Sequence, residues 1–183
     1  YARPVLGDVT ARACLAVAEG GEPFSAALPA GTTARQLAIS PGGGLHVASS
    51  GGLLSLTARG WQPLAIHDDV GRAWAARDVP GVVFDSRGQL WFASKAGVGC
   101  QTEKGWRFYE GKDGLPWNDF TGIAAGPQGE VWFTTHLGVI RFDGQAWHYR
   151  QGPRWLPNDD VGQAAMDAQG AAWFATAAGV GGI

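Results

Sequence analysis

The sequence is poor in charge, in cysteine and in long hydrophobic runs. Only 16% of its 183 residues are charged, and 14 Lys and Arg residues stand against 16 Asp and Glu residues. A nucleic-acid-binding domain normally carries a basic face, so this composition excludes nucleic acid as an expected partner. Gly, Pro or a charged residue interrupts each apolar run within about ten residues, too soon to span a bilayer. We therefore expect no membrane insertion by this segment.

The scarce reactive side chains give little sign of catalytic or metal chemistry. Two cysteines, Cys14 and Cys100, are too few for a disulfide scaffold. The sequence contains no CxxC pair, so nothing indicates a zinc site built on thiolates. We expect two buried thiols, with a bridge between them as the alternative. The four histidines lack metal-ligand spacing, and no GxSxG, SxxK, HExxH or phosphate-binding glycine loop occurs. The sequence thus predicts no cofactor and no metal ion.

What the sequence has in abundance is glycine and tryptophan, and both recur with a period. Residues 88–94, 129–135 and 170–176 lie 41 apart and share the pattern Gly-x-x-Trp-Phe followed by two small residues. Residues 45–49 form a weaker copy, in which His46 stands in the place of the tryptophan. A second set recurs about 15 residues later: Trp61, Trp106 and Trp147. The chain therefore contains four copies, the last of which ends after about half its length.

Within one copy the residues favour β structure. Residues 119–125, 131–135, 139–142 and 146–150 are short apolar, aromatic or β-branched runs separated by turn residues. The turn Asp143-Gly144 is a strong hairpin signal. Four short strands in about 41 residues are typical of one blade of a β-propeller. No ten-residue window without Gly or Pro carries a helical apolar stripe, which excludes a helical solenoid.

The copies resemble the two-component-regulator propeller repeat of bacterial extracytoplasmic sensor regions. The resemblance is carried by Leu156-Pro157-Asn158-Asp159-Asp160-Val161, Trp173-Phe174-Ala175-Thr176 and, one copy earlier, Leu115-Pro116, Val131-Trp132-Phe133 and Asp143-Gly144. It covers residues 76–183 well, 33–75 loosely and 1–32 hardly at all. Streptogramin-lyase-like propellers share the element at residues 126–134 but lack the Leu-Pro-Asn element, so they are the second choice. The resemblance implies a periplasmic or extracellular sensor domain.

The period divides the chain into one propeller domain or propeller fragment. We assign residues 33–75, 76–116 and 117–157 to blades and residues 158–183 to half a blade. Residues 1–32 read as the outer strands of a split or preceding blade, because 13–20 and 23–29 are two apolar runs. Two arrangements remain open: a four-bladed ring closed by both termini, or a fragment of a propeller with six to eight blades.

Antiparallel strand order predicts one face on which chemistry could gather. The connections between blades and the turns after each second strand lie at the same end of the blades, near the central channel. The recurring tryptophans are expected in the core, and the recurring Asp78, Asp119 and Asp160 are expected to accept backbone N–H bonds in turns. Trp74, Trp117 and Trp155 do not recur, and an indole beside Asn and Asp suits a sugar ring. Covering the end of a sheet is their structural alternative.

The candidate ligand-binding residues are therefore those of the blade connections and of one turn. They are Trp117, Asn118, Asp119, His136, Trp155, Asn158 and Asp159. These residues predict a non-catalytic ligand-binding or sensing module, whose ligand is a small molecule or an oligosaccharide. A scaffold or accessory subunit with a protein partner is the alternative. A lyase-like enzyme with His136 as general base is the third hypothesis, although a metal and a second polar group are missing for it.

Overall fold

The computed structural model describes residues 25–183, and it is built almost entirely of antiparallel β-sheet. The first sheet, blade 1, contains β1 (Ala34–Ile39), β2 (Leu45–Ser49), β3 (Gly52–Thr57) and β4 (Gly60–Pro63). Blade 2 contains β5 (Gly81–Phe84), β6 (Leu90–Ser94), β7 (Gly97–Thr102) and β8 (Gly105–Tyr109). A short 3₁₀ turn, η1 (Gly111–Asp113), follows β8.

The second half of the chain continues the same pattern. Blade 3 contains β9 (Phe120–Ala125), β10 (Val131–Thr135), β11 (Gly138–Phe142) and β12 (Trp147–Arg150). Blade 4 has three strands, β13 (Val161–Met166), β14 (Ala172–Thr176) and β15 (Gly179–Gly182). Each sheet falls within one of the four ranges that the period predicts. No helix in residues 25–183 is long and apolar enough to cross a membrane.

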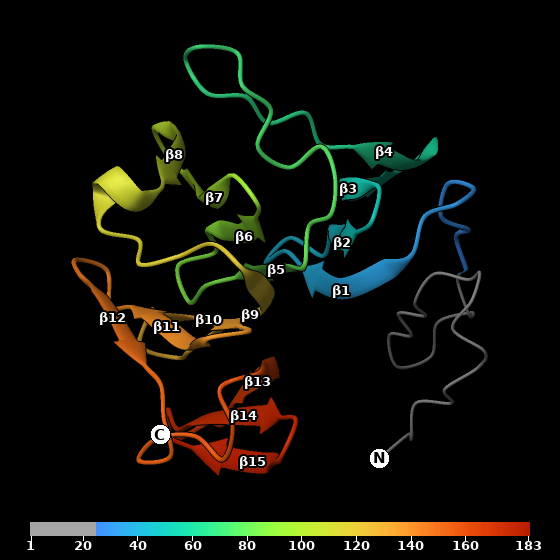
Figure 1. The fold of residues 1–183 in the computed structure, drawn as a ribbon. Helices are drawn as coiled ribbons and strands as arrows, with labels where there is room; N and C mark the ends of the chain where they lie inside the picture. The colour runs from blue at the N-terminus through green and yellow to red at the C-terminus, as the bar shows by residue number, and fades with distance from the viewer. Residues whose placement is uncertain (1–24) are drawn as a thin grey trace.

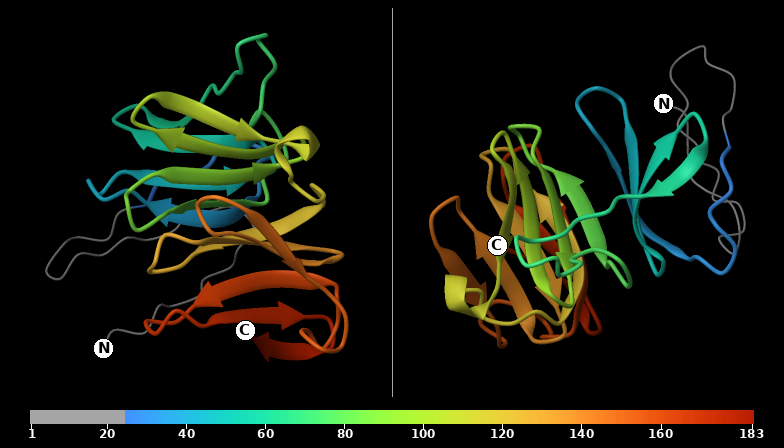
Figure 2. Two further views of the ribbon diagram at one scale, coloured as in Figure 1. Left: turned by 90° about the vertical axis from the view of Figure 1, so that its left-hand side faces the viewer. Right: turned by 90° about the horizontal axis from the view of Figure 1, so that it is seen from above.

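The four sheets are arranged as the blades of a β-propeller, which confirms the predicted fold class (Figure 1). The innermost strands pack in the order β1, β5, β9 and β13 around a common centre. Neighbouring sheets pack face to face, as the turned views show (Figure 2). Each blade runs from its inner to its outer strand, so each connection to the next blade crosses one end of the propeller.

The recurring glycine after each second strand is required by the backbone. Gly52, Gly97 and Gly138 all have φ between 105° and 134°, a region that other residues rarely adopt. At Gly97 a Cβ atom would lie 2.3 Å from the carbonyl oxygen of Tyr109. This turn therefore tolerates only glycine, which explains why the Gly-aliphatic pair marks every copy.

The recurring tryptophans fill the space between one blade and the next. Trp91 packs on Phe142 at 5.6 Å between ring centroids, and Trp132 packs on Phe174 at 5.2 Å. In blade 1 His46 takes this place and lies 5.3 Å from Phe84. These contacts confirm the expected core role of the two tryptophans.

Trp173, expected to be buried like its equivalents, is 49% exposed. It lies with Ala175 and Val180 on the face of blade 4 that points away from blade 3. No element in residues 25–183 packs against that face. The core prediction for Trp173 is therefore wrong for the described part of the chain, because the repeat supplies a tryptophan whose neighbouring blade is not there to cover it.

The N-terminal runs are described only in part. The predicted strand over residues 13–20, together with Phe24 and Cys14, lies outside the described residues. Residues 25–29 form no strand. Ala26 and Leu28 pack against Trp61, whose Nε1 atom donates a hydrogen bond to the carbonyl oxygen of Ala26 at 3.2 Å. This segment thus covers blade 1 on the side where blades 2 and 3 each have a preceding blade.

Candidate ligand-binding face

The structure brings the blade connections and the turns after the second strands together at one end of the propeller. The backbone N–H of His136 donates to the carbonyl oxygen of Asp119 at 3.4 Å, and that of Ala177 to Asp160 at 3.1 Å. Ser50 makes the same contact with Thr33. In blades 1, 3 and 4 the turn therefore adjoins the residue that precedes the first strand of its own blade, as the strand order predicts.

The recurring aspartates do not accept backbone N–H bonds, so that expectation is wrong. The Asp78 carboxylate accepts from Arg35 at 3.0 Å, and Asp160 pairs with Nδ1 of His136 at 2.6 Å. The Asp119 carboxylate has no hydrogen-bond or ion-pair partner in residues 25–183. Two of these three carboxylates therefore pair with side chains, and the third, that of Asp119, pairs with no group in the described residues.

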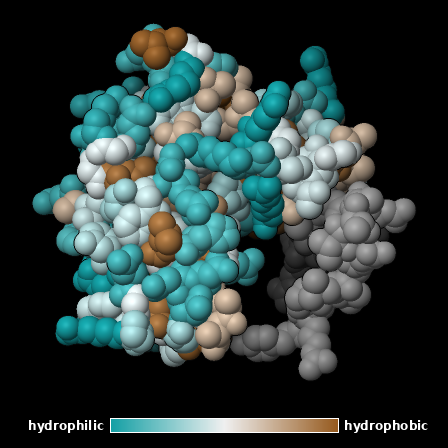
Figure 3. All heavy atoms as spheres, in the orientation of Figure 1, coloured by the Kyte–Doolittle hydropathy of each residue, from teal (hydrophilic) through white to brown (hydrophobic). Residues whose placement is uncertain are grey.

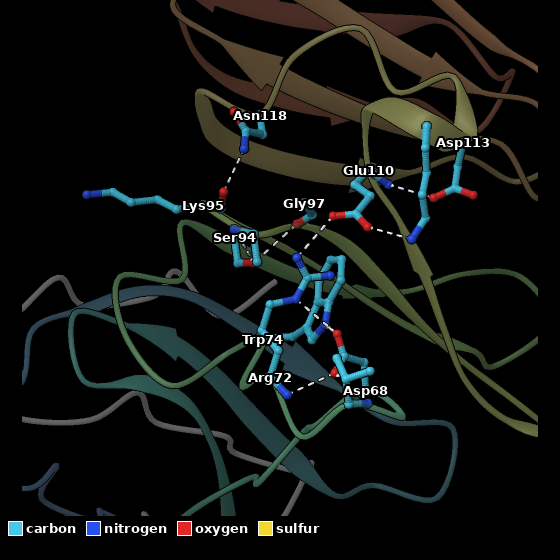
Figure 4. Close-up of polar contacts among 12 residues, drawn as sticks. Asp68, Arg72, Trp74, Ser94, Lys95, Gly97, Glu110, Asp113 and Asn118 are labelled. Atoms are coloured by element: carbon cyan, nitrogen blue, oxygen red, sulfur yellow. Dashed lines mark hydrogen bonds and ion pairs between the residues drawn. The ribbon is translucent and has the colours of Figure 1, made fainter.

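A hollow of about 160 Å³ lies at the mouth of the central channel. It is lined by Arg35, Asp78, Lys95, Asn118 and Asp119 together with Pro80, Ser94 and Phe120. The Nδ2 atom of Asn118 donates to the carbonyl oxygen of Lys95 at 2.6 Å, while the Lys95 side chain points away from the other labelled residues (Figure 4). A second hollow of about 410 Å³, which shares Arg35 and Pro80, continues between the inner strands. This mouth is polar and has no aromatic side chain suited to stacking except Phe120, which is buried.

Two of the three non-recurring tryptophans have structural roles. Trp74 is buried, stacks on Phe108 at 4.4 Å and donates through Nε1 to Oδ2 of Asp68 at 3.0 Å. Trp117 is half-buried and donates to Oγ1 of Thr135 at 2.9 Å. The N–H group of each indole is therefore satisfied within the chain, while the Trp117 ring remains partly exposed.

Trp155 is different, because it is 36% exposed and flanked by cations. The guanidinium carbons of Arg150 and Arg154 lie 4.8 Å and 5.2 Å from its ring centroid. Such pairs hold an indole in place. The Nη1 atom of Arg150 also donates a hydrogen bond to the carbonyl oxygen of Tyr149 at 2.8 Å, which fixes this guanidinium group. Trp155 and residues 147–151 line a groove of about 420 Å³ along β12, called here the aromatic groove.

Tyr149 supplies the second exposed aromatic ring of the aromatic groove. It is exposed on one side and meets the edge of Trp117 at 5.4 Å on the other. Trp117 therefore packs against the side of the Tyr149 ring that does not face solvent. Figure 3 shows that the face in view is mostly hydrophilic, with hydrophobic residues scattered singly.

Asn158 and Asp159 shape the connection that carries Trp155. The Oδ1 atom of Asn158 accepts from the backbone N–H of Asp160 at 2.7 Å, and Oδ1 of Asp159 accepts from Gly152 at 2.6 Å. Both bonds close turns, as short polar side chains often do. These two residues therefore stabilise the connection that carries Trp155.

The structure thus separates the predicted residues into three places. Asn118 and Asp119 line the channel mouth, His136 sits beside it in an exposed pair with Asp160, and Trp155 lies on the aromatic groove. Sequence reasoning missed Tyr149, Arg150 and Arg154. Their signal was available: Arg150 stands where the preceding copy has Tyr109, 41 residues earlier, so the repeat does not demand a cation there.

The comparisons with known proteins show the fold. No protein-family model and no curated protein matches the chain. Among solved structures, the extracellular domain of the hybrid two-component system BT3049 from B. thetaiotaomicron matches with a TM-score of 0.64 and 19% identity, over 81% of this chain and 21% of that one. Streptogramin B lyase matches with a TM-score of 0.56 and 18% identity, over 90% and 69%. PorZ, a bacterial surface component of the type-IX secretion system of Porphyromonas gingivalis, matches with a TM-score of 0.64 and 16% identity, over 97% and 30%.

Both propeller families that the repeats resemble are therefore represented among the matching structures. The chain spans about a fifth of the two-component-system domain that it matches. At these identities the likeness establishes a shared propeller fold, whereas function has to be argued from the site.

Proposed function

We propose that the chain is a non-catalytic ligand-binding or sensing module that recognises an oligosaccharide outside the cytoplasm. The observation that carries this proposal is the aromatic groove, where Tyr149 and Trp155 are exposed beside the guanidinium groups of Arg150 and Arg154. Exposed rings stack on the apolar faces of sugar rings, and fixed guanidinium donors bind hydroxyl and carboxylate oxygens.

The groove is better suited to this task than the channel mouth. Its volume of about 420 Å³ falls within the ~300–1,000 Å³ of ordinary ligand sites. The mouth hollow of about 160 Å³ is smaller and lacks an accessible ring. Lys95, Asn118 and Asp119 could still bind a small polar group there, which makes the mouth a secondary candidate.

The neighbours give limited support to the location. One matching structure is described as an extracellular domain of a two-component system, and another belongs to a surface component of a secretion system. These descriptions concern those proteins. They support a position outside the cytoplasm for this chain.

The test is a titration of the whole 183-residue chain with neutral and acidic oligosaccharides, in which binding is measured by tryptophan fluorescence and by calorimetry. Trp155 should report binding, because a sugar over its exposed ring changes its environment. A saturable response to at least one oligosaccharide class supports the proposal. A flat response to the entire panel, by both methods, rejects it.

A scaffold or accessory role is the second candidate, and one observation favours it. The outward face of blade 4 exposes Trp173 and Val180, which are 49% and 68% exposed. An uncovered sheet face of this kind is a contact surface for another element or chain. Purification of the chain with a partner of fixed stoichiometry, lost on Trp173→Asp, would favour this role over glycan binding.

A further inference from the structure

A polar pocket between blades 3 and 4 contains two buried donors without a partner. The Nε1 atom of Trp132 and the Nε atom of Arg141 are the buried side-chain nitrogens that lack a hydrogen bond within residues 25–183. Trp132 is only 7% exposed. Both residues line a hollow of about 240 Å³ together with Glu130, His148 and Arg150. A buried donor without an acceptor is costly, so its persistence calls for an explanation.

The other blades show what this tryptophan normally does. In blade 2 the Nε1 atom of Trp91 donates to Oδ2 of Asp85 at 2.9 Å, and in blade 4 Trp173 donates to Asp167 at 3.1 Å. The aspartate stands six residues before the tryptophan in both cases. In blade 3 the same position is Gly126, 41 residues from each aspartate. The acceptor that the repeat provides for its tryptophan is thus missing at Trp132.

Glu130 does not replace that acceptor. A Cβ atom at Gly126 would lie 1.9 Å from Oε1 of Glu130, so the Glu130 carboxylate fills the space that an aspartate side chain would need. Its Oε2 atom accepts from the backbone N–H of Gln128 at 3.0 Å. It therefore serves the turn, as the aspartates do elsewhere, but leaves the buried indole N–H of Trp132 without an acceptor in residues 25–183.

Two cationic side chains, Arg141 and Arg150, form part of the remaining wall, together with Gln128, His148, Gly170 and Ile183. Arg141 stands where blade 2 has Cys100, and its guanidinium carbon lies 5.9 Å from the Trp132 ring centroid. Strand register places Trp132, Arg141 and His148 in one row across blade 3. Arg150 lines both this pocket and the aromatic groove, so the two hollows adjoin.

We propose that this pocket binds the carboxylate of an acidic sugar residue, a uronic acid, at the end of an oligosaccharide. The indole N–H of Trp132 and the guanidinium groups of Arg141 and Arg150 supply the donors for the carboxylate. The Glu130 carboxylate faces them and accepts from a sugar hydroxyl group. The two guanidinium groups outnumber the single Glu130 carboxylate, and the remaining ionisable wall residue, His148, pairs with Asp143 at 2.7 Å, so the wall favours an anionic ligand group. The part of the inference that concerns a sugar rests on the proposed function of the aromatic groove.

The pocket is small enough to select one residue of the sugar chain. Its volume of about 240 Å³ lies below the ~300–1,000 Å³ of drug-sized sites, so it suits a single small group. The rest of an oligosaccharide would pass Arg150 into the aromatic groove and reach Trp155. The pocket would thus select oligosaccharides that end in an acidic sugar residue, and the aromatic groove would bind any sugar ring.

The test compares D-glucuronate with D-glucose, using ¹⁵N-labelled indole signals of the full chain by NMR. The Trp132 signal, assigned by its loss in Trp132→Phe, should move with glucuronate and not with glucose. In calorimetric titrations with a glucuronate-terminated oligosaccharide, Trp132→Phe should weaken binding by roughly 10- to 100-fold, the effect of removing one hydrogen bond to a charged group. An unmoved Trp132 signal at high glucuronate concentration overturns the proposal.

A double variant, Gly126→Asp with Glu130→Gln, serves as the decisive control. It reproduces the Asp85 and Gln89 arrangement of blade 2 and gives Trp132 an internal acceptor. The variant should fold with an unchanged or higher melting temperature and lose its response to glucuronate. Wild-type affinity in this folded variant contradicts the proposal. A wild-type chain that does not respond to glucuronate could still bind neutral oligosaccharides and lose this binding on Trp155→Ala. That result would show that the aromatic groove binds sugar although the pocket lined by Trp132 and Arg141 does not bind an acid.

Discussion

The Nε1 atom of Trp91 donates a hydrogen bond to Oδ2 of Asp85, six residues earlier, at 2.9 Å. The other oxygen of the same carboxylate accepts the backbone N–H groups of Arg87 and Gln89, both at 2.9 Å. One carboxylate therefore closes the turn between the first two strands and fixes the core tryptophan. Asp167 and Trp173 repeat this arrangement in blade 4.

Removing this carboxylate in blade 2 should destabilise the propeller. Asp85 is buried, so Asp85→Ala leaves three donors unsatisfied, and we expect a loss of about 3 kcal/mol in the free energy of unfolding. Denaturant unfolding followed by circular dichroism measures it. Asp167→Ala is the matched control, because Trp173 is half exposed and water can replace the acceptor there. An equal loss in the two variants would contradict this explanation.

The non-recurring pair Asp68 and Trp74 predicts a loss of stability in acid. The hydrogen bond from the Trp74 indole, with further bonds from the Arg72 backbone and side chain, lowers the pKa of the Asp68 carboxyl to about 2. The unfolded chain therefore binds a proton more readily, and the contribution of Asp68 to stability is lost as the pH falls from about 4 toward 2. The melting temperature of Asp68→Asn should depend less on pH in this window. An equal pH dependence of the melting temperature in wild type and Asp68→Asn would show that Asp68 makes no such contribution to stability.

His46 predicts a second pH dependence, in a milder range. Partial burial against Phe84 lowers the pKa of its imidazole below the ordinary value of 6.5. Because the unfolded state accepts the proton more easily, stability should fall as the pH drops below about 6.5. Replacing His46 by Phe should remove this part of the slope. Unfolding curves of the two proteins between pH 7.5 and 5.5 test it, and parallel slopes would count against it.

Cys100 should be unreactive in the folded protein. Burial raises the pKa of its thiol to about 12, and its Sγ atom lies 3.8 Å from Oε1 of Gln89. The thiolate, which is the reactive form, is therefore rare at neutral pH. In a Cys14→Ser variant, alkylation by iodoacetamide should be slow until denaturant is added. Rapid modification under native conditions would show that the thiol is accessible.

The period of the sequence was sufficient to predict the blades. The glycine after each second strand is required by a turn with positive φ and recurs in every copy. The Trp-Phe pairs follow from inter-blade packing and recur in three copies, with His46 in the place of the tryptophan in the first. The orientation of the non-recurring tryptophans could not be read in this way. Trp117 and Trp155 both stand in blade connections near Asn and Asp, and only tertiary contacts make the first half-buried and leave the second exposed.

The pocket between blades 3 and 4, lined by Trp132 and Arg141, is marked by a signal that the sequence did contain. The six-residue spacing of Asp85 to Trp91 and of Asp167 to Trp173, with Gly126 in the corresponding position of blade 3, is visible in the printed chain. Its meaning required the hydrogen bonds, since an aspartate in a turn has many possible partners. The missing partner of Trp132 and its proximity to Arg141 became apparent only when the strands were in register.

The aromatic groove is tested most directly by a calorimetric titration of an oligosaccharide that binds the wild-type chain, repeated with Trp155→Ala and with Trp173→Ala. Both variants remove an exposed indole, but only Trp155 lines the groove. We expect Trp155→Ala to weaken binding by about two- to tenfold, since stacking contributes roughly 0.5–1.5 kcal/mol beyond the buried area, and Trp173→Ala to leave it unchanged. Equal affinity in wild type and Trp155→Ala would contradict the groove as the ligand site.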